Sequence, residues 1–330
     1  MAILVTGGAG YIGSHMVLNL ADSGETVIVL DNLTTGFDWA VDPRARLVVG
    51  QAGDMNLVSD IIAQYQVDAI VHFAGSLVVP ESVTHPLKYY ANNTTTSRNL
   101  IEAAVNGGVK HFIFSSTAAV YGDAGLEPVT EGSPLAPESP YGRSKLMTEM
   151  MLADTAAAHP LTYGVLRYFN VSGADPRQRS GQSSPTATHL IKVATQAALG
   201  QRPRMSIFGT DFSTPDGTGV RDYIHVTDLV NAHALMLAYL RDGGGPIVAN
   251  CGYGRGFSVR DVVQAVKTVS GVDFPVVEEV RRPGDPASVV ANSDKIRRLL
   301  GWKPAHDDLG EIVRTALDWE RYLATGSHRR

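Results

Sequence analysis

The sequence predicts an α/β protein with a doubly wound parallel sheet and a smaller C-terminal α/β lobe. Three observations carry this prediction. A glycine-rich turn joins an apolar strand to a helix within the first 21 residues, strand-like and helix-like segments alternate as far as residue 170, and beyond that point the pattern becomes irregular. We therefore expect a cofactor-binding domain over residues 1–170 and a second lobe, mainly over residues 171–330. The boundary should be discontinuous, because segments near residues 220–255 are expected to return to the first domain.

Composition and charge narrow the classes of function. The chain has 330 residues and a formal net charge of −5, so we expect no electrostatic footprint for nucleic acid. Its longest apolar runs have the length of strands, which predicts no membrane span. Cys251 is the only cysteine, which excludes an intramolecular disulfide, fits a reducing compartment and makes a cysteine-based metal site implausible. Since no charged-then-apolar leader precedes the first strand, we expect a cytoplasmic protein, and we expect no metal.

The first 13 residues predict a strand followed by a dinucleotide-binding turn. Residues 3–6 are apolar and β-prone, the turn is Gly7-Gly8-Ala9-Gly10-Tyr11-Ile12-Gly13, and residues 14–21 have the pattern of a helix. Gly7, Gly10 and Gly13 would let the backbone approach a pyrophosphate without Cβ clashes, and the start of the helix would direct N–H groups at that anion. The alternative is a glycine-rich turn that binds nothing, and the strand that follows argues against it.

The second strand, expected over residues 26–30, ends in an acidic residue. Asp31 at this place can bind a ribose 2′-hydroxyl and would repel a 2′-phosphate, so NAD is favoured over NADP. Asn32 begins a polar loop suited to the adenosine end of the cofactor. Asp54 follows a third strand at residues 46–50. It is either an acceptor for the adenine amino group or the N-cap of a helix over residues 55–64, and the sequence leaves both open.

Strands and helices continue to alternate up to residue 170. The expected strands are residues 68–75, 110–116 and 161–167, and the expected helices are residues 89–106 and 144–157. In an open parallel sheet the turns at the carboxyl ends of the strands face the ligand crevice. Phe73 and Ala74 lie in such a turn, Ser115 lies near the end of the next strand, and Asn92 lies on the first turns of the long helix.

The rest of the chain predicts the elements of a second lobe. We expect helices over residues 189–199, 258–269, 295–300 and 309–324, strands over residues 205–208 and 276–281, and a helix-rich return over residues 223–240. Residues 247–251 are an apolar run of strand length. We expect this run to rejoin the main sheet.

Tyr141 and Lys145 form the second informative pattern. Residues four apart on a helix share a face, and an ammonium group beside a phenol stabilises the phenolate, as does the positive charge of an oxidised nicotinamide. A tyrosine tuned in this way is a usable general acid or base near neutral pH. Tyr-x-x-x-Lys alone is a weak signal that a surface pair also satisfies. It gains weight here because a strand upstream ends in Ser115-Ser116-Thr117.

Together these motifs resemble the sugar-nucleotide branch of the extended short-chain dehydrogenase/reductase family, and within it the UDP-glucose 4-epimerases. The resemblance extends from residue 1 to about residue 320. It rests on the segments Thr6-Gly7-Gly8-Ala9-Gly10-Tyr11-Ile12-Gly13, Ser115-Ser116-Thr117-Ala118-Ala119-Val120-Tyr121-Gly122, Tyr141-x-x-x-Lys145, Arg167-Tyr168-Phe169-Asn170, Gly217-Thr218-Gly219-Val220-Arg221-Asp222-Tyr223-Ile224-His225-Val226 and Arg281-Arg282-Pro283-Gly284-Asp285.

The resemblance implies interconversion of UDP-glucose and UDP-galactose by transient oxidation at C4, with one bound NAD and non-stereospecific return of the hydride. Tyr141 would take the proton of the sugar 4-hydroxyl. Lys145 would hold the nicotinamide ribose and depress the pKa of Tyr141, and Thr117 would hydrogen-bond the sugar O4. The implied NAD contacts are Gly7, Gly10, Tyr11, Ile12, Gly13, Asp31, Asn32, Asp54, Phe73, Ala74, Asn92, Ser115, Tyr141, Lys145 and Tyr168.

The resemblance also implies how the UDP-sugar is held. Arg221 and Arg282 suit bidentate phosphate contacts, while Asn170 and Asp285 would bind phosphate or hydroxyl groups. The strand with Phe208 resembles the one that receives uracil, although an aromatic residue on a strand fits a core equally well. The full implied set is Thr117, Tyr141, Asn170, His189, Leu190, Ser206, Phe208, Arg221, Arg282, Asp285 and Val289.

Three positions depart from the family pattern. Leu77 stands where many of these enzymes have a lysine near the cofactor, so one ionic contact to NAD is missing. His189 replaces an asparagine that touches the diphosphate. Val289 falls where the family varies between a bulky tyrosine and a small residue. Because valine is smaller than tyrosine, UDP-N-acetylglucosamine is an additional candidate substrate.

Other functions compete with this interpretation. Related dehydratases and decarboxylases place acidic residues directly after the threonine, whereas this chain has Ala118-Ala119, which cannot move a proton. A UDP-xylose/UDP-arabinose 4-epimerase needs the same chemistry at C4 and is harder to exclude. A non-catalytic NAD-dependent regulator need not keep Thr117, Tyr141 and Lys145 together. The resemblance also favours a homodimer, formed through the helices at residues 89–106 and 144–157.

Overall fold

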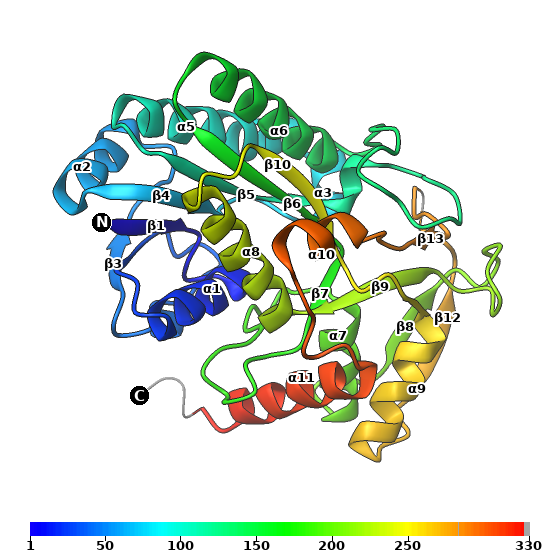
Figure 1. Ribbon diagram of the computed structural model, residues 1–330. Coiled ribbons are helices and arrows are strands. Elements are labelled where there is room, and N and C mark those ends of the chain that lie inside the picture. The colour runs from blue at the N-terminus through cyan, green and yellow to red at the C-terminus, as the bar shows by residue number, and fades with distance from the viewer. Residues whose placement is uncertain (283, 327–330) are drawn as a thin grey trace.

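A seven-stranded, entirely parallel sheet forms the centre of the molecule (Figure 1), in a computed structural model that describes residues 1–282 and 284–326. Its strands, in spatial order, are β3 (Arg46–Val49), β2 (Val27–Asp31), β1 (Ala2–Thr6), β4 (Val67–His72), β5 (His111–Thr117), β6 (Thr162–Tyr168) and β10 (Ile247–Cys251). The order reverses between β1 and β4, as in doubly wound dinucleotide-binding folds. The predicted fold class is confirmed.

β1 carries apolar side chains on both of its faces, which suits a strand in the middle of the sheet. Ile3 and Val5 pack into a core on one face, whereas Ala2 and Leu4 pack into a second core on the other. Figure 1 shows helices on both faces of the sheet, α1 and α8 on one side and α2, α5 and α6 on the other. Burial on both faces makes β1 a continuous apolar run, as is typical of central parallel strands.

The helices of this part of the chain begin and end as follows: α1 (Tyr11–Asp22), α2 (Met55–Tyr65), α3 (Val79–Thr84), α4 (Pro86–Tyr89), α5 (Thr96–Asn106), α6 (Pro140–Ala158) and α8 (Val226–Arg241). A π-helical turn, Tyr90–Thr95, connects α4 to α5. The predicted single helix over residues 89–106 is therefore three successive helical segments. Turns of this type add one residue to the local repeat and occur frequently at functional sites.

The smaller lobe is built around β9 (Val220–His225). It pairs with β7 (Asn170–Ser172), β11 (Gly256–Ser258) and β13 (Ser288–Val289), and a separate parallel pair joins β8 (Met205–Phe208) to β12 (Val276–Glu279). The helices are α7 (Leu190–Ala198), α9 (Val259–Ser270), α10 (Asp294–Leu300) and α11 (Leu309–Ala324). The helix-rich return predicted from residue 223 is wrong at its start, because residues 223–225 complete β9 and α8 begins only at Val226.

The return of the chain to the main sheet occurs at β10, which pairs with β6 from Ile247 to Cys251 as predicted. α8, which precedes β10, packs beside α1 and contacts β5 and β6. The division into a domain at residues 1–170 and a lobe at residues 171–330 stays a prediction. It describes a boundary that the chain crosses more than once.

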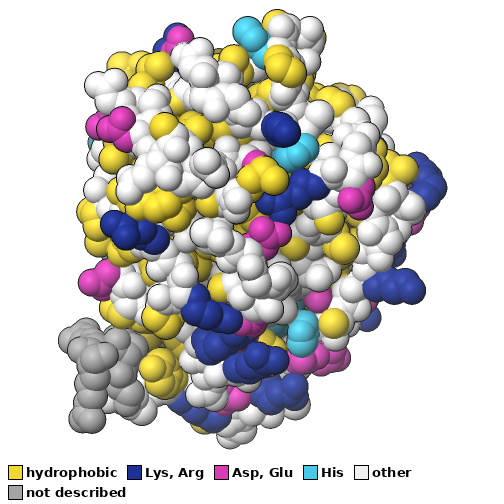
Figure 2. All heavy atoms as spheres, turned by 60° about the vertical axis from the view of Figure 1, so that its left-hand side comes forward, with side chains coloured by type: hydrophobic (Ala, Val, Ile, Leu, Met, Phe, Trp, Pro, Cys, Tyr) yellow, Lys and Arg dark blue, Asp and Glu magenta, His cyan; other side chains and the backbone are white. Residues whose placement is uncertain are grey.

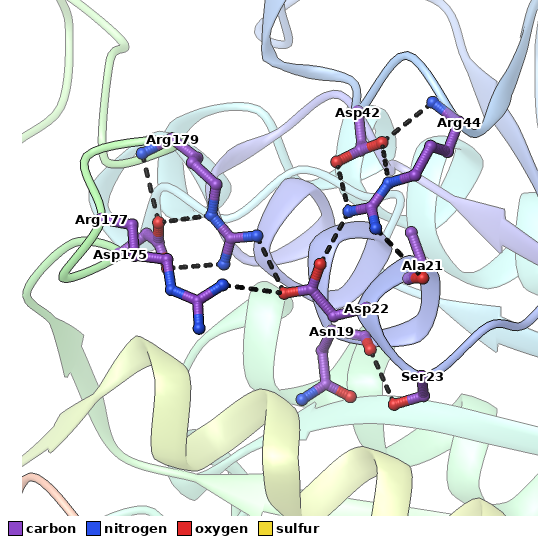
Figure 3. A network of polar contacts seen from close by, with 9 residues as sticks. All are labelled: Asn19, Ala21, Asp22, Ser23, Asp42, Arg44, Asp175, Arg177 and Arg179. Atoms are coloured by element: carbon purple, nitrogen blue, oxygen red, sulfur yellow. Dashed lines mark hydrogen bonds and ion pairs between the residues drawn. The ribbon is translucent and has the colours of Figure 1, made fainter.

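A surface network of ion pairs joins the two parts of the chain at the end of α1 (Figure 3). Asp22 accepts from Arg44 at 2.7 Å and from Arg179 at 2.8 Å, and these arginines are held in turn by Asp42 and Asp175. Both hydrogen bonds lower the pKa of Asp22, the one from Arg44 more strongly. On the face drawn in Figure 2, acidic side chains lie among the basic ones. No helix among the described residues is long and apolar enough to cross a bilayer.

Candidate active site

The glycine turn between β1 and α1 packs so closely that three of its positions have little or no space for a side chain. Gly7 has a φ of +71°, and a Cβ there would lie 2.7 Å from the backbone nitrogen of Ala74. A Cβ on Gly13 would lie 2.1 Å from the carbonyl oxygen of Gly7, and one on Gly10 would lie 3.3 Å from it. Tyr11 and Ile12 form the first turn of α1 directly after this cradle. The backbone is thus arranged as a pyrophosphate site at a helix N-terminus requires.

Asp31 lies at the end of β2, beside the glycine turn. Its two carboxylate oxygens accept from the backbone N–H of Ala9 at 3.0 Å and of Leu33 at 2.8 Å. These bonds fix the carboxylate beside the glycine turn, and contact with the cofactor ribose stays a prediction for Asp31. Asn32 follows it, and its side chain donates to Gln51 at 3.1 Å. The glycine cradle and the fixed acidic group together fit NAD.

Asp54 is the N-cap of α2. One of its carboxylate oxygens accepts from the backbone N–H of Asn56 and of Leu57, both at 3.1 Å. The structure therefore confirms the capping role that the sequence left open. A contact with adenine stays a prediction for the same side chain.

The turn after β4 is held in place by Asn93, a residue of the π-helical turn that sequence reasoning missed. Phe73 and Ala74 pack against the glycine turn, as expected for crevice residues. Asn92 is exposed and donates to the Ser76 hydroxyl at 2.8 Å. Its neighbour Asn93 is buried: its amide oxygen accepts from the Ser76 N–H at 2.7 Å, and its amide nitrogen donates to the Ser76 carbonyl at 3.0 Å. Two consecutive asparagines reach one serine from the π-helical turn.

Tyr141 lies in the first turn of α6, which Ser139 caps by accepting from the Gly142 N–H at 3.1 Å. Burial raises the pKa of the Tyr141 phenol, and a hydrogen bond with the Thr117 side chain opposes this rise. Thr117 also accepts from the Ala119 N–H at 3.1 Å, so its oxygen is oriented at the end of β5. The lowering of the Tyr141 pKa that we expected from Lys145 is not found. Burial dominates, and Thr117 is the group that counters it.

Lys145 lies one turn further along α6 and is buried against β5. Its Nζ donates to the Ser115 carbonyl at 3.0 Å and lies 4.9 Å from the centre of the Phe114 ring. Burial lowers the pKa of Lys145 to about 8, and the negative charge of Glu149 acts in the opposite direction. The Ser115 hydroxyl donates to the Tyr168 hydroxyl at 2.9 Å. The structure thus brings these predicted site residues together at the carboxyl ends of β5 and β6.

A second group of predicted residues lies on the smaller lobe. Arg221 donates to Asp285 at 2.5 Å and to the carbonyl of its neighbour Val220 at 2.8 Å, which fixes its guanidinium group. The Arg282 guanidinium lies 3.7 Å from the centre of the Phe208 ring, so these two predicted contacts are stacked on each other. Val289 is the register partner of Arg221 in the parallel β13–β9 pair. Ser206, on the same strand as Phe208, donates to Glu279 at 3.5 Å.

Val289 connects this group to the catalytic turn. It packs against a small apolar core that includes Ala118 and Val120, which directly follow Thr117, and Phe169 at the end of β6. The remaining predicted contacts lie elsewhere on the lobe: Asn170 is exposed at the start of β7, and His189 and Leu190 lie at the start of α7. Burial lowers the pKa of His189, which favours its neutral form.

Comparison with known proteins agrees with this geometry. The model of the NAD dependent epimerase/dehydratase family matches residues 3–252. The UDP-glucose 4-epimerase of Azospirillum brasilense is 55% identical over 321 residues, which cover 97% of this chain and 92% of that protein. The structure of UDP-glucose 4-epimerase from Brucella ovis in complex with NAD is 42% identical with a TM-score of 0.93, covering 96% of this chain and 97% of the other.

The name of a third relative gives two sugars. The UDP-Glc/GlcNAc 4-epimerase from Campylobacter jejuni is 47% identical with a TM-score of 0.85, covering 97% of this chain and 99% of the other. These identities extend over nearly the full length of both chains. The matched segment also contains the glycine cradle, Thr117, Tyr141 and Lys145. The chain therefore belongs to the NAD dependent epimerase/dehydratase family and, within it, to the UDP-glucose 4-epimerases.

Proposed function

We propose that this protein interconverts UDP-glucose and UDP-galactose by oxidation and reduction at C4 with NAD. The observation that carries the proposal is the placement of Tyr141, its partner Thr117 and the buried Lys145 at the carboxyl ends of β5 and β6. The glycine cradle lies at the end of β1 in the same sheet. When bound there, NAD supplies reversible hydride transfer at C4 of the sugar.

The protein's own residues accept and return the proton of that reaction. Tyr141 takes the proton of the 4-hydroxyl as C4 becomes a ketone, and returns it after the sugar has turned over in the site. Because burial raises the pKa of Tyr141, the phenolate needs a stabilising group, and the Thr117 side chain supplies a hydrogen bond that lowers this pKa. No water-derived proton is needed, since the same phenol donates what it accepted.

The rest of the substrate is held on the smaller lobe. Arg221 is fixed by Asp285 and presents a planar cation suited to a diphosphate. Phe208 and Arg282 form a stacked pair at the end of β8, where a uracil ring is expected. Binding at the uridine diphosphate would leave the sugar free to present either face to the cofactor. A sugar that can turn in this way would accept hydride on either face of C4.

The direct test supplies purified protein with UDP-galactose, UDP-N-acetylgalactosamine and UDP-arabinose separately, with and without added NAD. We expect conversion of UDP-galactose to UDP-glucose without net formation of NADH. Conversion of the pentose alone would support the alternative UDP-xylose/UDP-arabinose 4-epimerase. No conversion of any sugar would contradict the proposal, and comparison with and without NAD reports how well the cofactor is retained beside Leu77.

UDP-N-acetylglucosamine should also be a substrate. Val289 packs beside the catalytic turn. Because valine is smaller than the tyrosine found there in part of the family, we expect it to leave room for an acetamido group at C2. We expect detectable epimerisation of this sugar, with the ratio of kcat/KM for the acetamido sugar to that for UDP-glucose falling about 100-fold in Val289→Tyr, the scale of an overpacked pocket. The assay is coupled measurement of both sugars with each protein. Activity on UDP-glucose and none on the acetamido sugar would contradict this prediction.

We also propose a homodimer acting in the cytoplasm. Exposed apolar side chains lie on α3, α4 and α6: Val83 is 62% exposed, Leu87 79% and Met150 60%. Met150 lies within the expected interface segment 144–157, whereas Val83 and Leu87 directly precede the expected segment 89–106. Such a patch is typical of a protein interface. Sedimentation equilibrium should give twice the chain mass of 35.3 kDa, and a concentration-independent monomer would contradict the dimer. The single buried thiol of Cys251 supports the reducing location.

A further inference from the structure

A buried polar network lies behind Lys145, and the reaction described above does not use it. Glu149 follows Lys145 by one turn of α6 and is only 6% exposed. Its two carboxylate oxygens accept from Nε of Arg167 at 3.1 Å, and Oε2 accepts from Nη2 at 2.6 Å. The Ser116 hydroxyl also donates to Oε1. Arg167, on β6, is 4% exposed, so both charges are removed from water.

Ser116 connects this network to the candidate active site. Ser116 lies between Ser115, whose carbonyl accepts from Lys145, and Thr117, which hydrogen-bonds Tyr141. Glu149 therefore attaches α6 to β5 at the residue between these two catalytic contacts. Since the three α6 residues are spaced four apart, they lie along one face of the helix.

The charges around Lys145 give the network a second effect. Burial lowers the pKa of Lys145, and Glu149 is the carboxylate that raises it. The other titratable neighbours stay neutral: burial lowers the pKa of His72 to about 3, with Lys145 contributing, and burial raises the pKa values of Tyr141 and Tyr168. Glu149 thus opposes the loss of the Lys145 proton.

Arg167 extends the network across the sheet. Its Nη1 donates to the Tyr121 hydroxyl at 3.1 Å, and that hydroxyl donates to Asn250 at 2.6 Å. Asn250 lies on β10 and donates to the Val129 carbonyl at 2.9 Å. An ion pair removed from water usually adds little net stability, so its presence beside a catalytic lysine calls for a role.

We propose that Glu149, held by Arg167 and Ser116, is a positioning residue that keeps Lys145 charged and keeps α6 in register with the end of β5. The kinetic part of its test rests on the proposed epimerase function. The effect on Lys145 itself does not, because the lysine can be followed in the protein without a substrate.

The test uses the opposite charges of the two partners. Glu149→Gln removes the negative charge and leaves Arg167 uncompensated, so the alkaline limb of the kcat–pH profile should move down by about one pH unit. Arg167→Gln leaves Glu149 uncompensated, so the limb should move up. Ser116→Ala removes a hydrogen bond without changing any charge, and should lower kcat without moving the limb. KM for the UDP-sugar should change little in each variant, because the expected contacts with its uridine diphosphate lie on the smaller lobe.

A second readout follows Lys145 directly. NMR of the protein with isotope-labelled lysine across pH, with Lys145→Met to identify the signal, measures the protonation of this one buried amine. We expect the titration of Lys145 to move down in Glu149→Gln and up in Arg167→Gln. If a single variant does not fold, the double variant Glu149→Gln/Arg167→Gln, in which both buried charges are removed, should show a smaller downward shift.

The matched control is a second buried ion pair, Lys192–Glu320, whose side chains are each 5% exposed. It joins α7 to α11, on the opposite side of the molecule from α6 in Figure 1. Glu320→Gln should destabilise the fold and leave the titration of Lys145 unchanged. The proposal is overturned if both partners of the Glu149 pair shift that titration in the same direction, or if Glu149→Gln and the double variant leave it unchanged. An inactive wild type with the expected titration shifts would count against the epimerase function alone.

Discussion

Tyr141→Phe is expected to lower kcat by about 1,000-fold in both directions of the reaction, because in the proposed mechanism the Tyr141 hydroxyl exchanges a proton with the sugar 4-hydroxyl. The ring would keep its packing, including its edge contact with Tyr89 at a centroid distance of 6.4 Å. Binding of the UDP-sugar should therefore change little. Steady-state kinetics with UDP-galactose and UDP-glucose measure the effect on kcat and KM separately.

Tyr89→Phe is the matched control for this substitution. Tyr89 is a fully buried tyrosine whose hydroxyl lies 2.7 Å from the Val78 carbonyl and 2.8 Å from Glu81 and donates its one proton between them, so the variant also removes a bonded phenol oxygen. It should reduce stability by about 1 kcal/mol and alter kcat by no more than a few-fold. A Tyr141→Phe protein that retained more than a tenth of the wild-type kcat would contradict the assigned role.

Gly13→Ala is expected to abolish NAD binding and to lower the free energy of unfolding by about 3 kcal/mol. The added Cβ would lie 2.1 Å from the carbonyl oxygen of Gly7 and 2.8 Å from the Cα of Gly8, and backbone atoms cannot give way as a flexible side chain does. The cradle would have to open, which displaces the start of α1 from the pyrophosphate position. Thermal denaturation and the NAD content of the purified protein measure the two effects.

Gly245→Ala serves as the comparison, since a Cβ at that glycine would meet nothing within 4 Å and its φ is not in the left-handed region. Its melting temperature and NAD content should equal those of the wild type. Normal NAD retention by Gly13→Ala would show that the turn at residues 7–13 does not hold the cofactor.

Much of the fold and the centre of the site could be predicted because their signals are local. The glycine spacing, the apolar run before it and Asp31 all lie within one βαβ unit, and Tyr141 and Lys145 are one helical turn apart. Arg221 and Asp285 are 64 residues apart and bond to each other only in the folded chain. Only the resemblance to a family identified them as site residues, because their spacing in the sequence carries no information.

Other features could not be predicted because they depend on burial. A glutamate four residues after a lysine on a helix is the ordinary pattern of an exposed pair, and nothing local distinguishes Glu149 from one. Burial also distinguishes two neighbours in the π-helical turn, because Asn93 is buried and Asn92 is exposed. The raised pKa of Tyr141 has the same origin: the sequence shows the charge of Lys145, whereas the cost of leaving water appears only in the folded protein.

The pairing of β10 with β6 has a consequence for how the protein is made. β6 ends at Tyr168 and β10 begins at Ile247, so the ribosome must add about 80 residues between them. At roughly 5–20 residues each second, this takes on the order of ten seconds. During that interval the backbone of β6 has a free edge, because the strand that pairs with residues 164–168 is absent. Unpaired edges of this kind recruit other chains. The nascent protein is therefore most prone to aggregate after its nucleotide-binding half has been translated, and a chaperone would be needed most at that stage.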